Sequence, residues 1–188
     1  QVNTEEELVQ RLTSSEDPSV LLPTDQDIEE KLPLRNLTNA QARVFLYLIE
    51  ASIRDREAHS TTLAGLSHYT VEHVMPKKWP YHWGALPEPE ARVRTNLVLK
   101  LGNLTLLSGK LNRTSRDSDW DTKKRGTKQH GGHIRYGSGL DIFADELEEM
   151  EWTEDSIRER SQRLAELAVS VWPYPTAEES AVPIGESM

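Results

Sequence analysis

Two short segments decide how this chain is interpreted: Tyr69-Thr-Val-Glu-His-Val-Met-Pro76 and Leu101-Gly-Asn-Leu-Thr-Leu-Leu107. Each is rich in β-branched or other apolar residues, so each predicts a short strand. The first strand ends in an acid–imidazole pair, Glu72 and His73. The second is soon followed by Asn112, close to the start of a predicted helix. A hairpin packed on a helix would bring Glu72, His73 and Asn112 close together.

The predicted hairpin, with strands at 68–74 and 103–107, is flanked by helices. Residues 39–57 carry one apolar stripe at helical spacing, and Thr38 or Asn39 is the expected N-cap. A second amphipathic helix is predicted over 153–171, capped by Thr153, and a shorter one near 89–100. The expected class is therefore α+β, a small ββα finger embedded in a mainly helical domain.

Composition excludes several classes of protein. The chain has 188 residues and no cysteine, which excludes disulfide scaffolds, thiol catalysis and cysteine-ligated zinc. No apolar run is long enough to span a membrane, and the polar N-terminus is no signal peptide, so we expect a cytoplasmic protein. The net charge is −9, yet residues 68–136 hold 13 basic and 6 acidic side chains. Such a basic centre can bind phosphate despite the acidic total, although a solvated face explains it equally well.

The side chains of the hairpin suggest a phosphodiester hydrolysis site. Glu72 and Asn112 offer the oxygen ligands that Mg²⁺ prefers, and Mn²⁺ can substitute. His73 titrates near neutrality and can accept a proton from an attacking water. Neighbouring strand residues point to opposite faces, so both act at one site only if the strand ends or bulges there. Otherwise Glu72 turns away to pair with a lysine, and Asn112 serves as a helix cap or turn residue.

Other candidates follow the hairpin. Asn103 is a catalytic candidate, although a structural amide that bonds backbone across the loop is the favoured interpretation. Lys124, or its neighbour Lys123, is expected to stabilise charge at the scissile phosphate. His130 and His133 are expected to contact DNA or the loop rather than zinc, which needs more ligands. The predicted DNA-binding residues are basic side chains of segment 110–135: Lys110, Arg113, Arg116, Lys123, Lys124, Arg125, Lys128 and Arg135.

This ordered set resembles the HNH, or His-Me finger, endonucleases. More closely, the chain is similar to the C-terminal nuclease domain of GmrSD-type modification-dependent restriction proteins, over roughly residues 24–173. The resemblance rests on the two quoted segments, Trp79 or Trp83, Asn112, the spacing from Trp120 to Lys123 or Lys124, and the Trp152-to-Trp172 helix. It implies a ββα-metal finger, Mg²⁺-dependent DNA cleavage, and antiviral defence against modified phage DNA. It also implies an upstream nucleotide-hydrolysing domain. These 188 residues do not contain that domain, because no phosphate-binding glycine loop occurs in them.

The expected organisation has three parts. Residues 1–35 form a helical lead-in or linker from an upstream domain, 36–173 the nuclease domain, and 174–188 a disordered acidic tail. The leading hypothesis is a metal-dependent DNA endonuclease domain. The alternative is a non-catalytic module that binds nucleic acid or protein and retains the nuclease frame.

Overall fold

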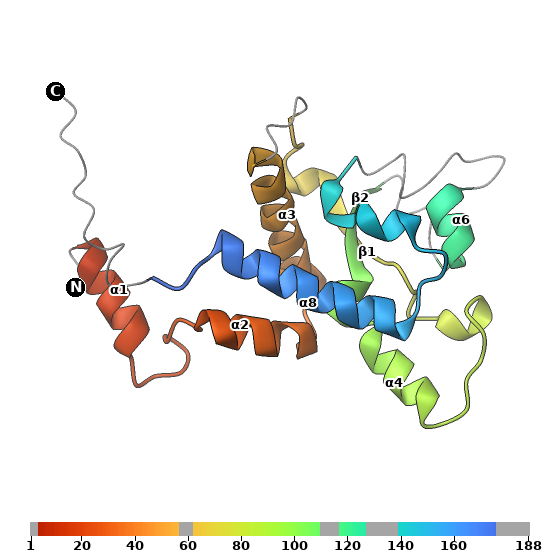
Figure 1. The fold of residues 1–188 in the computed structure, drawn as a ribbon, viewed down its shortest axis with the longest axis horizontal. Coiled ribbons are helices and arrows are strands. Elements are labelled where there is room, and N and C mark those ends of the chain that lie inside the picture. Colours follow the sequence, from red (N-terminus) through yellow and green to blue (C-terminus); the bar gives the residue numbers. More distant parts are fainter. Residues whose placement is uncertain (1–3, 57–61, 110–116, 127–138, 176–188) are drawn as a thin grey trace.

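A two-stranded antiparallel sheet lies at the centre of the computed structural model, which describes residues 4–56, 62–109, 117–126 and 139–175. Strand β1 (Tyr69–His73) pairs with β2 (Leu104–Ser108) from Tyr69↔Ser108 to His73↔Leu104. Both predicted strands are confirmed, each with its ends shifted by about one residue. The sheet and the surrounding helices form the expected α+β fold (Figure 1).

Two long helices pack around the sheet as the apolar stripes predicted. Helix α3 (Asn39–Arg56) buries Ala42, Leu46 and Ile49 completely and packs against both strands. It begins with a cap in which the Thr38 hydroxyl accepts from the Gln41 amide at 3.3 Å. Helix α8 (Glu154–Val171) crosses in front of α3 in Figure 1 and packs against it. Its predicted cap, the Thr153 side chain, is confirmed.

Shorter helices complete the domain. Helix α4 (Glu90–Leu97) confirms the predicted short helix, whereas α6 (Trp120–Arg125) was not predicted. In the lead-in, α2 (Asp25–Lys31) packs against α8, and α1 (Glu5–Ser14) buries no residue and lies apart from the body (Figure 1). Short 3-10 turns lie at Leu32–Leu34, Leu66–His68, Trp79–Tyr81, Leu101–Asn103, Asp141–Phe143 and Asp145–Glu148.

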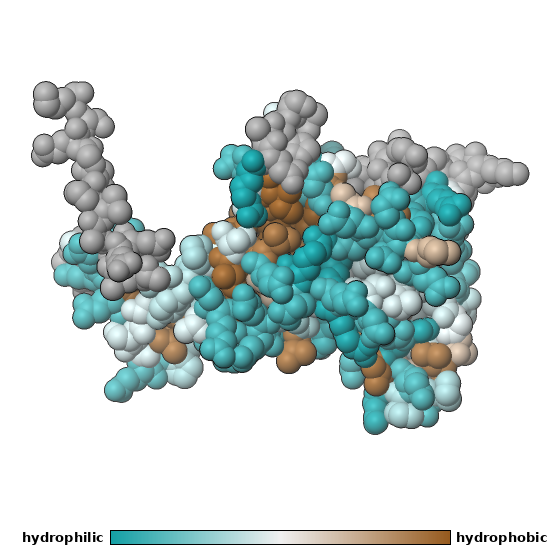
Figure 2. Space-filling view, viewed as in Figure 1, coloured by the Kyte–Doolittle hydropathy of each residue, from teal (hydrophilic) through white to brown (hydrophobic). Residues whose placement is uncertain are grey.

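The surface is mainly hydrophilic. In Figure 2, hydrophobic residues gather over α3, where Val44 is 42% and Leu48 38% exposed. Across the described part of the chain, no helix combines the length and the apolar character needed to cross a membrane.

The start of β2 is fastened to α8 by close backbone contact. The Gly102 amide donates to the Ser161 hydroxyl at 3.0 Å, and the buried Arg160 guanidinium donates to the Gly102 and Leu104 carbonyls, each at 2.7 Å. A Cβ atom at Gly102 would lie 2.1 Å from the Ile157 carbonyl oxygen, so only glycine allows this approach. These contacts fix the position of the neighbouring Asn103.

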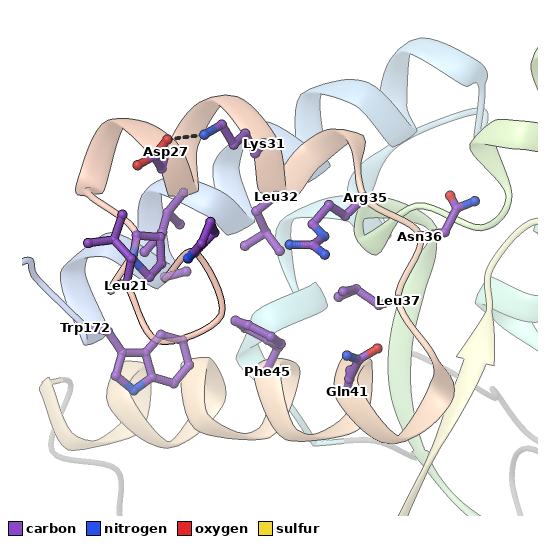
Figure 3. Close-up of a pocket in the computed structure, with 14 residues that line it drawn as sticks. Leu21, Asp27, Lys31, Leu32, Arg35, Asn36, Leu37, Gln41, Phe45 and Trp172 are labelled. Atoms are coloured by element: carbon purple, nitrogen blue, oxygen red, sulfur yellow. Dashed lines mark hydrogen bonds and ion pairs between the residues drawn. The ribbon is translucent and has the colours of Figure 1, made fainter. Parts of the chain in front are cut away.

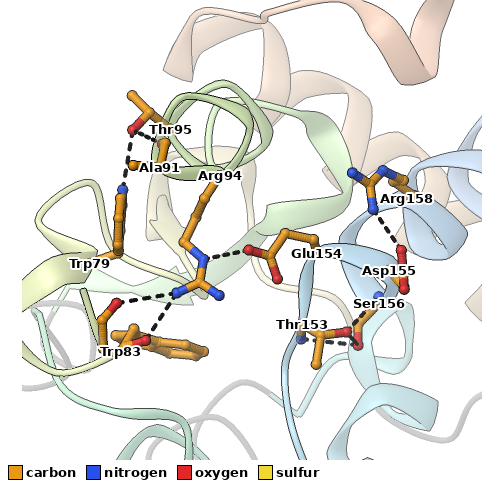
Figure 4. A network of polar contacts seen from close by, with 11 residues as sticks. Trp79, Trp83, Ala91, Arg94, Thr95, Thr153, Glu154, Asp155, Ser156 and Arg158 are labelled. Atoms are coloured by element: carbon orange, nitrogen blue, oxygen red, sulfur yellow. Dashed lines mark hydrogen bonds and ion pairs between the residues drawn. The ribbon is translucent and has the colours of Figure 1, made fainter. Parts of the chain in front are cut away.

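Helix α4 is tied to the first turn of α8 by a single guanidinium. Arg94 donates to the Glu154 carboxylate at 2.5 Å and to the Trp83 carbonyl at 2.9 Å, and it lies over the Trp79 ring (Figure 4). This network holds the segment that follows β1 against the rest of the domain.

Candidate active site

The predicted acid–imidazole pair lies at the end of β1. The strand pairs regularly up to His73 opposite Leu104, so it ends at this point without a bulge. The chain then leaves the sheet, with the Val74 amide donating to the Asn103 carbonyl at 2.9 Å. Glu72 and His73 are both paired within the strand, where neighbouring side chains point to opposite faces, so their action at one site stays a prediction.

Asn103 holds the loop that follows this pair. Its side-chain oxygen accepts from the Met75 amide at 2.8 Å and from the Trp152 indole at 3.1 Å. Its amide nitrogen donates to the Met75 carbonyl at 2.8 Å and to the Val98 carbonyl at 3.0 Å. The side chain is fully buried, and these four bonds use its full hydrogen-bonding capacity. The geometry therefore agrees with the structural alternative and leaves no free group for the catalytic role.

Glu72 is paired with a lysine of α6. Its carboxylate accepts from the Lys123 ammonium, which also donates to the His73 carbonyl at 2.7 Å. Glu72 is 7% exposed and Lys123 is fully buried. Burial raises the pKa of the Glu72 carboxyl, and the Lys123 charge opposes that rise. The lysine pairing, which the sequence left open, is thus present in the structure.

The His73 imidazole is held in its neutral form. Burial is the largest cause, and the positive charges of Lys77 and Lys123 act in the same direction, so its pKa falls to about 4. At neutral pH the ring is therefore unprotonated. This is the state in which an imidazole accepts a proton.

The two lysines of α6 do not have the positions expected of them. Lys124 was the predicted catalytic lysine, but its ammonium donates to the Glu149 carbonyl at 2.5 Å and lies 5.4 Å from the Trp120 ring centre. Lys123 reaches the site instead. Both side chains are buried, so neither ammonium is exposed for the contact with DNA phosphate that the sequence predicted. Among the described DNA-binding candidates Arg125 is exposed, and it pairs with Asp121 at 3.0 Å.

The physical reason is the face that α6 presents to the core. Trp120, Lys123 and Lys124 have the i, i+3 and i+4 spacing of one helix face, and that face is buried. Sequence reasoning treated the basic run as a patch because a six-residue helix gives little periodic signal.

Several predicted residues lie outside the described part of the chain: Asn112, Lys110, Arg113, Arg116, Lys128, Arg135, His130 and His133. Within the described part, no group of three or more histidine, aspartate or glutamate side chains is arranged to hold a metal. The oxygen set of Glu72 and Asn112 therefore stays a prediction.

Sequence reasoning missed two lysines beside the site. Lys77 and Lys78 are exposed, and the Lys77 charge acts on His73. Their position directly after the Glu72-to-Pro76 segment was the available signal. They are candidates for phosphate contact that the structure leaves accessible.

A pocket of about 550 Å³ lies elsewhere, between α2, α3 and the end of α8 (Figure 3). Its apolar lining includes Leu32, Phe45 and Trp172. None of the predicted site residues lines it, so it is separate from the candidate active site.

One family of known proteins matches this chain in sequence. The sequence model of the family described as GmrSD restriction endonucleases, C-terminal domain, matches residues 22–167. No curated protein matches the chain in sequence. The matched region contains the strands, the acid–imidazole pair and the whole of α6, and it begins within the predicted lead-in. The chain belongs to the family of GmrSD restriction endonuclease C-terminal domains.

Proposed function

We propose that this domain is a metal-dependent DNA endonuclease of the HNH, or His-Me finger, type. Membership of a restriction endonuclease family supports a nuclease that acts on DNA. The observation that carries the finer proposal is the neutral imidazole of His73 at the end of a two-stranded hairpin, one residue after Glu72. A base of this kind at a strand end fits hydrolysis of a phosphodiester.

The residues present fit a divalent cation. The charge of the Lys123 ammonium favours the ionised form of the Glu72 carboxylate, which is the form that binds a divalent cation. Glu72 together with Asn112 would hold Mg²⁺, with Mn²⁺ as a substitute, because both offer oxygen ligands. When bound there, the metal would supply charge stabilisation at the phosphoryl oxygens.

The chain's own groups perform the remaining steps. His73 accepts the proton of the attacking water. Asn103 keeps the loop after β1 fixed and so holds in place the backbone that follows His73. The exposed Lys77 and Lys78 hold the DNA backbone beside the imidazole.

The biological setting proposed with this activity is defence against phage. The domain would cut modified phage DNA, with an upstream nucleotide-hydrolysing domain controlling it. Membership of a restriction endonuclease family supports this setting. Comparing the cleavage rates of modified and unmodified phage DNA tests it.

Nicking of supercoiled plasmid tests the proposal. The purified chain should relax the plasmid with Mg²⁺ or Mn²⁺ and lose this activity in EDTA. Glu72→Gln should lower the rate because it removes a charged ligand, whereas Glu151→Gln, at an exposed loop position, should not. Plasmid binding without metal-dependent nicking would favour the non-catalytic module.

A further inference from the structure

Adjacent lysines on α6 have different surroundings. Lys123 and Lys124 are both buried, and each donates to a backbone carbonyl, of His73 and Glu149 respectively. Lys123 alone of the two also contacts a carboxylate, that of Glu72. We propose that Lys123 is a positioning residue: its ammonium is the counter-cation of Glu72 while no metal is bound. When a divalent cation binds, it shares the Glu72 carboxylate with the Lys123 ammonium. This inference rests on the proposed function.

The geometry gives the ammonium two tasks at once. One nitrogen contacts the side chain of the candidate metal ligand and the backbone of the candidate base, and so joins α6 to the end of β1. A buried ammonium is costly unless its charge is paired and its hydrogen bonds are made. Glu72 and the His73 carbonyl provide both, so Lys123 holds the carboxylate in place at the end of β1.

The same charge opposes metal binding. A divalent cation at Glu72 would lie close to the Lys123 ammonium, and like charges a few ångströms apart repel strongly in a partly desolvated site. Lys123 therefore lowers the affinity of the site for metal while it prepares the carboxylate. Removing the ammonium should strengthen metal binding by about tenfold or more, because the metal then becomes the sole countercharge.

Lys123→Met and Lys124→Met make a matched pair for the test. Calorimetric titration of the full chain with Mn²⁺ should give a Kd about tenfold lower for Lys123→Met than for the parent. Its Tm without metal should fall, and Mn²⁺ should raise it by more than it raises the parent's. Lys124→Met should lose stability yet keep the parent's Kd and Mn²⁺-dependent rise in Tm, since it does not contact Glu72.

An unchanged or weaker Mn²⁺ affinity in Lys123→Met would overturn the inference. If that variant folds only with Mn²⁺, the result supports the inference in its strongest form. If it does not fold at all, the double variant Glu72→Gln with Lys123→Met decides. Removal of both charges should restore folding, and an unfolded double variant would overturn the counter-cation role. A parent chain that binds no Mn²⁺ and nicks no DNA would instead contradict the proposed function.

Discussion

His73, the last residue of β1, and Asn103, directly before β2, have opposite kinds of surroundings. Asn103 has all its hydrogen bonds satisfied by neighbours, whereas the His73 imidazole has no hydrogen bond to any residue in the described ranges. A side chain with no free group serves the fold, and a neutral ring without a protein partner is free to take a proton. The division of roles between these two residues follows from their contacts.

The depressed pKa of His73 predicts an unusual pH profile for cleavage. A general base acts unprotonated, so activity is lost only as pH falls through its pKa, which lies at about 4. Single-turnover rates should stay level through the ordinary histidine pKa of about 6.5 and decline only on approach to pH 4. Circular dichroism at each pH separates this loss from unfolding. A decline centred near 6.5 would show that the base is not this imidazole.

At the scale of elements, the sequence predicted what periodic patterns encode. The apolar stripes of α3 and α8 and the caps at Thr38 and Thr153 gave helix positions to within about a residue or two. The β1–β2 pairing followed from two short apolar strands, and the position of Glu72 and His73 followed with it. Which lysine of α6 faces Glu72 was not predictable, because that depends on how a six-residue helix packs on the hairpin.

The contact between Gly102 and α8 predicts a steric effect. In Gly102→Ala, the added methyl would meet the Ile157 carbonyl and, at 2.4 Å, the Ser161 hydroxyl. We expect a loss of about 1–3 kcal/mol in the free energy of unfolding, measured with urea. Gly65→Ala is the control, because its φ is −61° and no atom lies within 4 Å of the added carbon. Equal stability of the two variants would contradict the close packing of α8 on this turn.

The ion pair between α4 and α8 predicts a pH-dependent stability. The hydrogen bond from Arg94 lowers the pKa of Glu154, so the pair stabilises the fold above the ordinary glutamate pKa. The contribution of the pair to stability is lost as pH falls through the lowered pKa of Glu154. Glu154→Gln should lower the free energy of unfolding by about 1 kcal/mol at pH 7, with the difference vanishing in acid. Glu151→Gln should match the parent throughout, and a pH-independent deficit in Glu154→Gln would exclude the linkage.

At the scale of the whole molecule, only part of the basic charge in the central segment faces solvent. The central segment is basic, but two of its lysines are buried: Lys123 pairs with the Glu72 carboxylate, and Lys124 donates to the Glu149 carbonyl. Lys77, Lys78 and Arg125 carry exposed positive charge, and the Lys77 charge acts on His73. A count of charges along a sequence cannot separate these two uses of lysine, because burial depends on the fold.

The exposed cations predict the salt dependence of DNA binding. Replacing Lys77, Lys78 and Arg125 together with alanine should weaken binding to unrelated duplexes alike. The slope of log affinity against log salt should flatten by about 2–3 units, since each phosphate contact contributes roughly 0.9. Fluorescence anisotropy over a salt series measures this. The control replaces Arg11, Lys31 and Arg35, which belong to the lead-in, and it should leave the slope unchanged. Similar slopes for both triple variants would show that DNA does not bind at Lys77, Lys78 and Arg125.

The central claim is that His73 performs the chemistry of a DNA endonuclease. The most direct measurement is the single-turnover cleavage rate of His73→Ala on DNA that is already bound, with His68→Ala, an exposed neighbour, as control. Loss of a general base lowers such a rate by about 10²–10⁴-fold. We predict that loss in Mg²⁺, with DNA affinity and the free energy of unfolding close to the parent's. Cleavage of bound DNA by His73→Ala at the parent's rate would contradict the account.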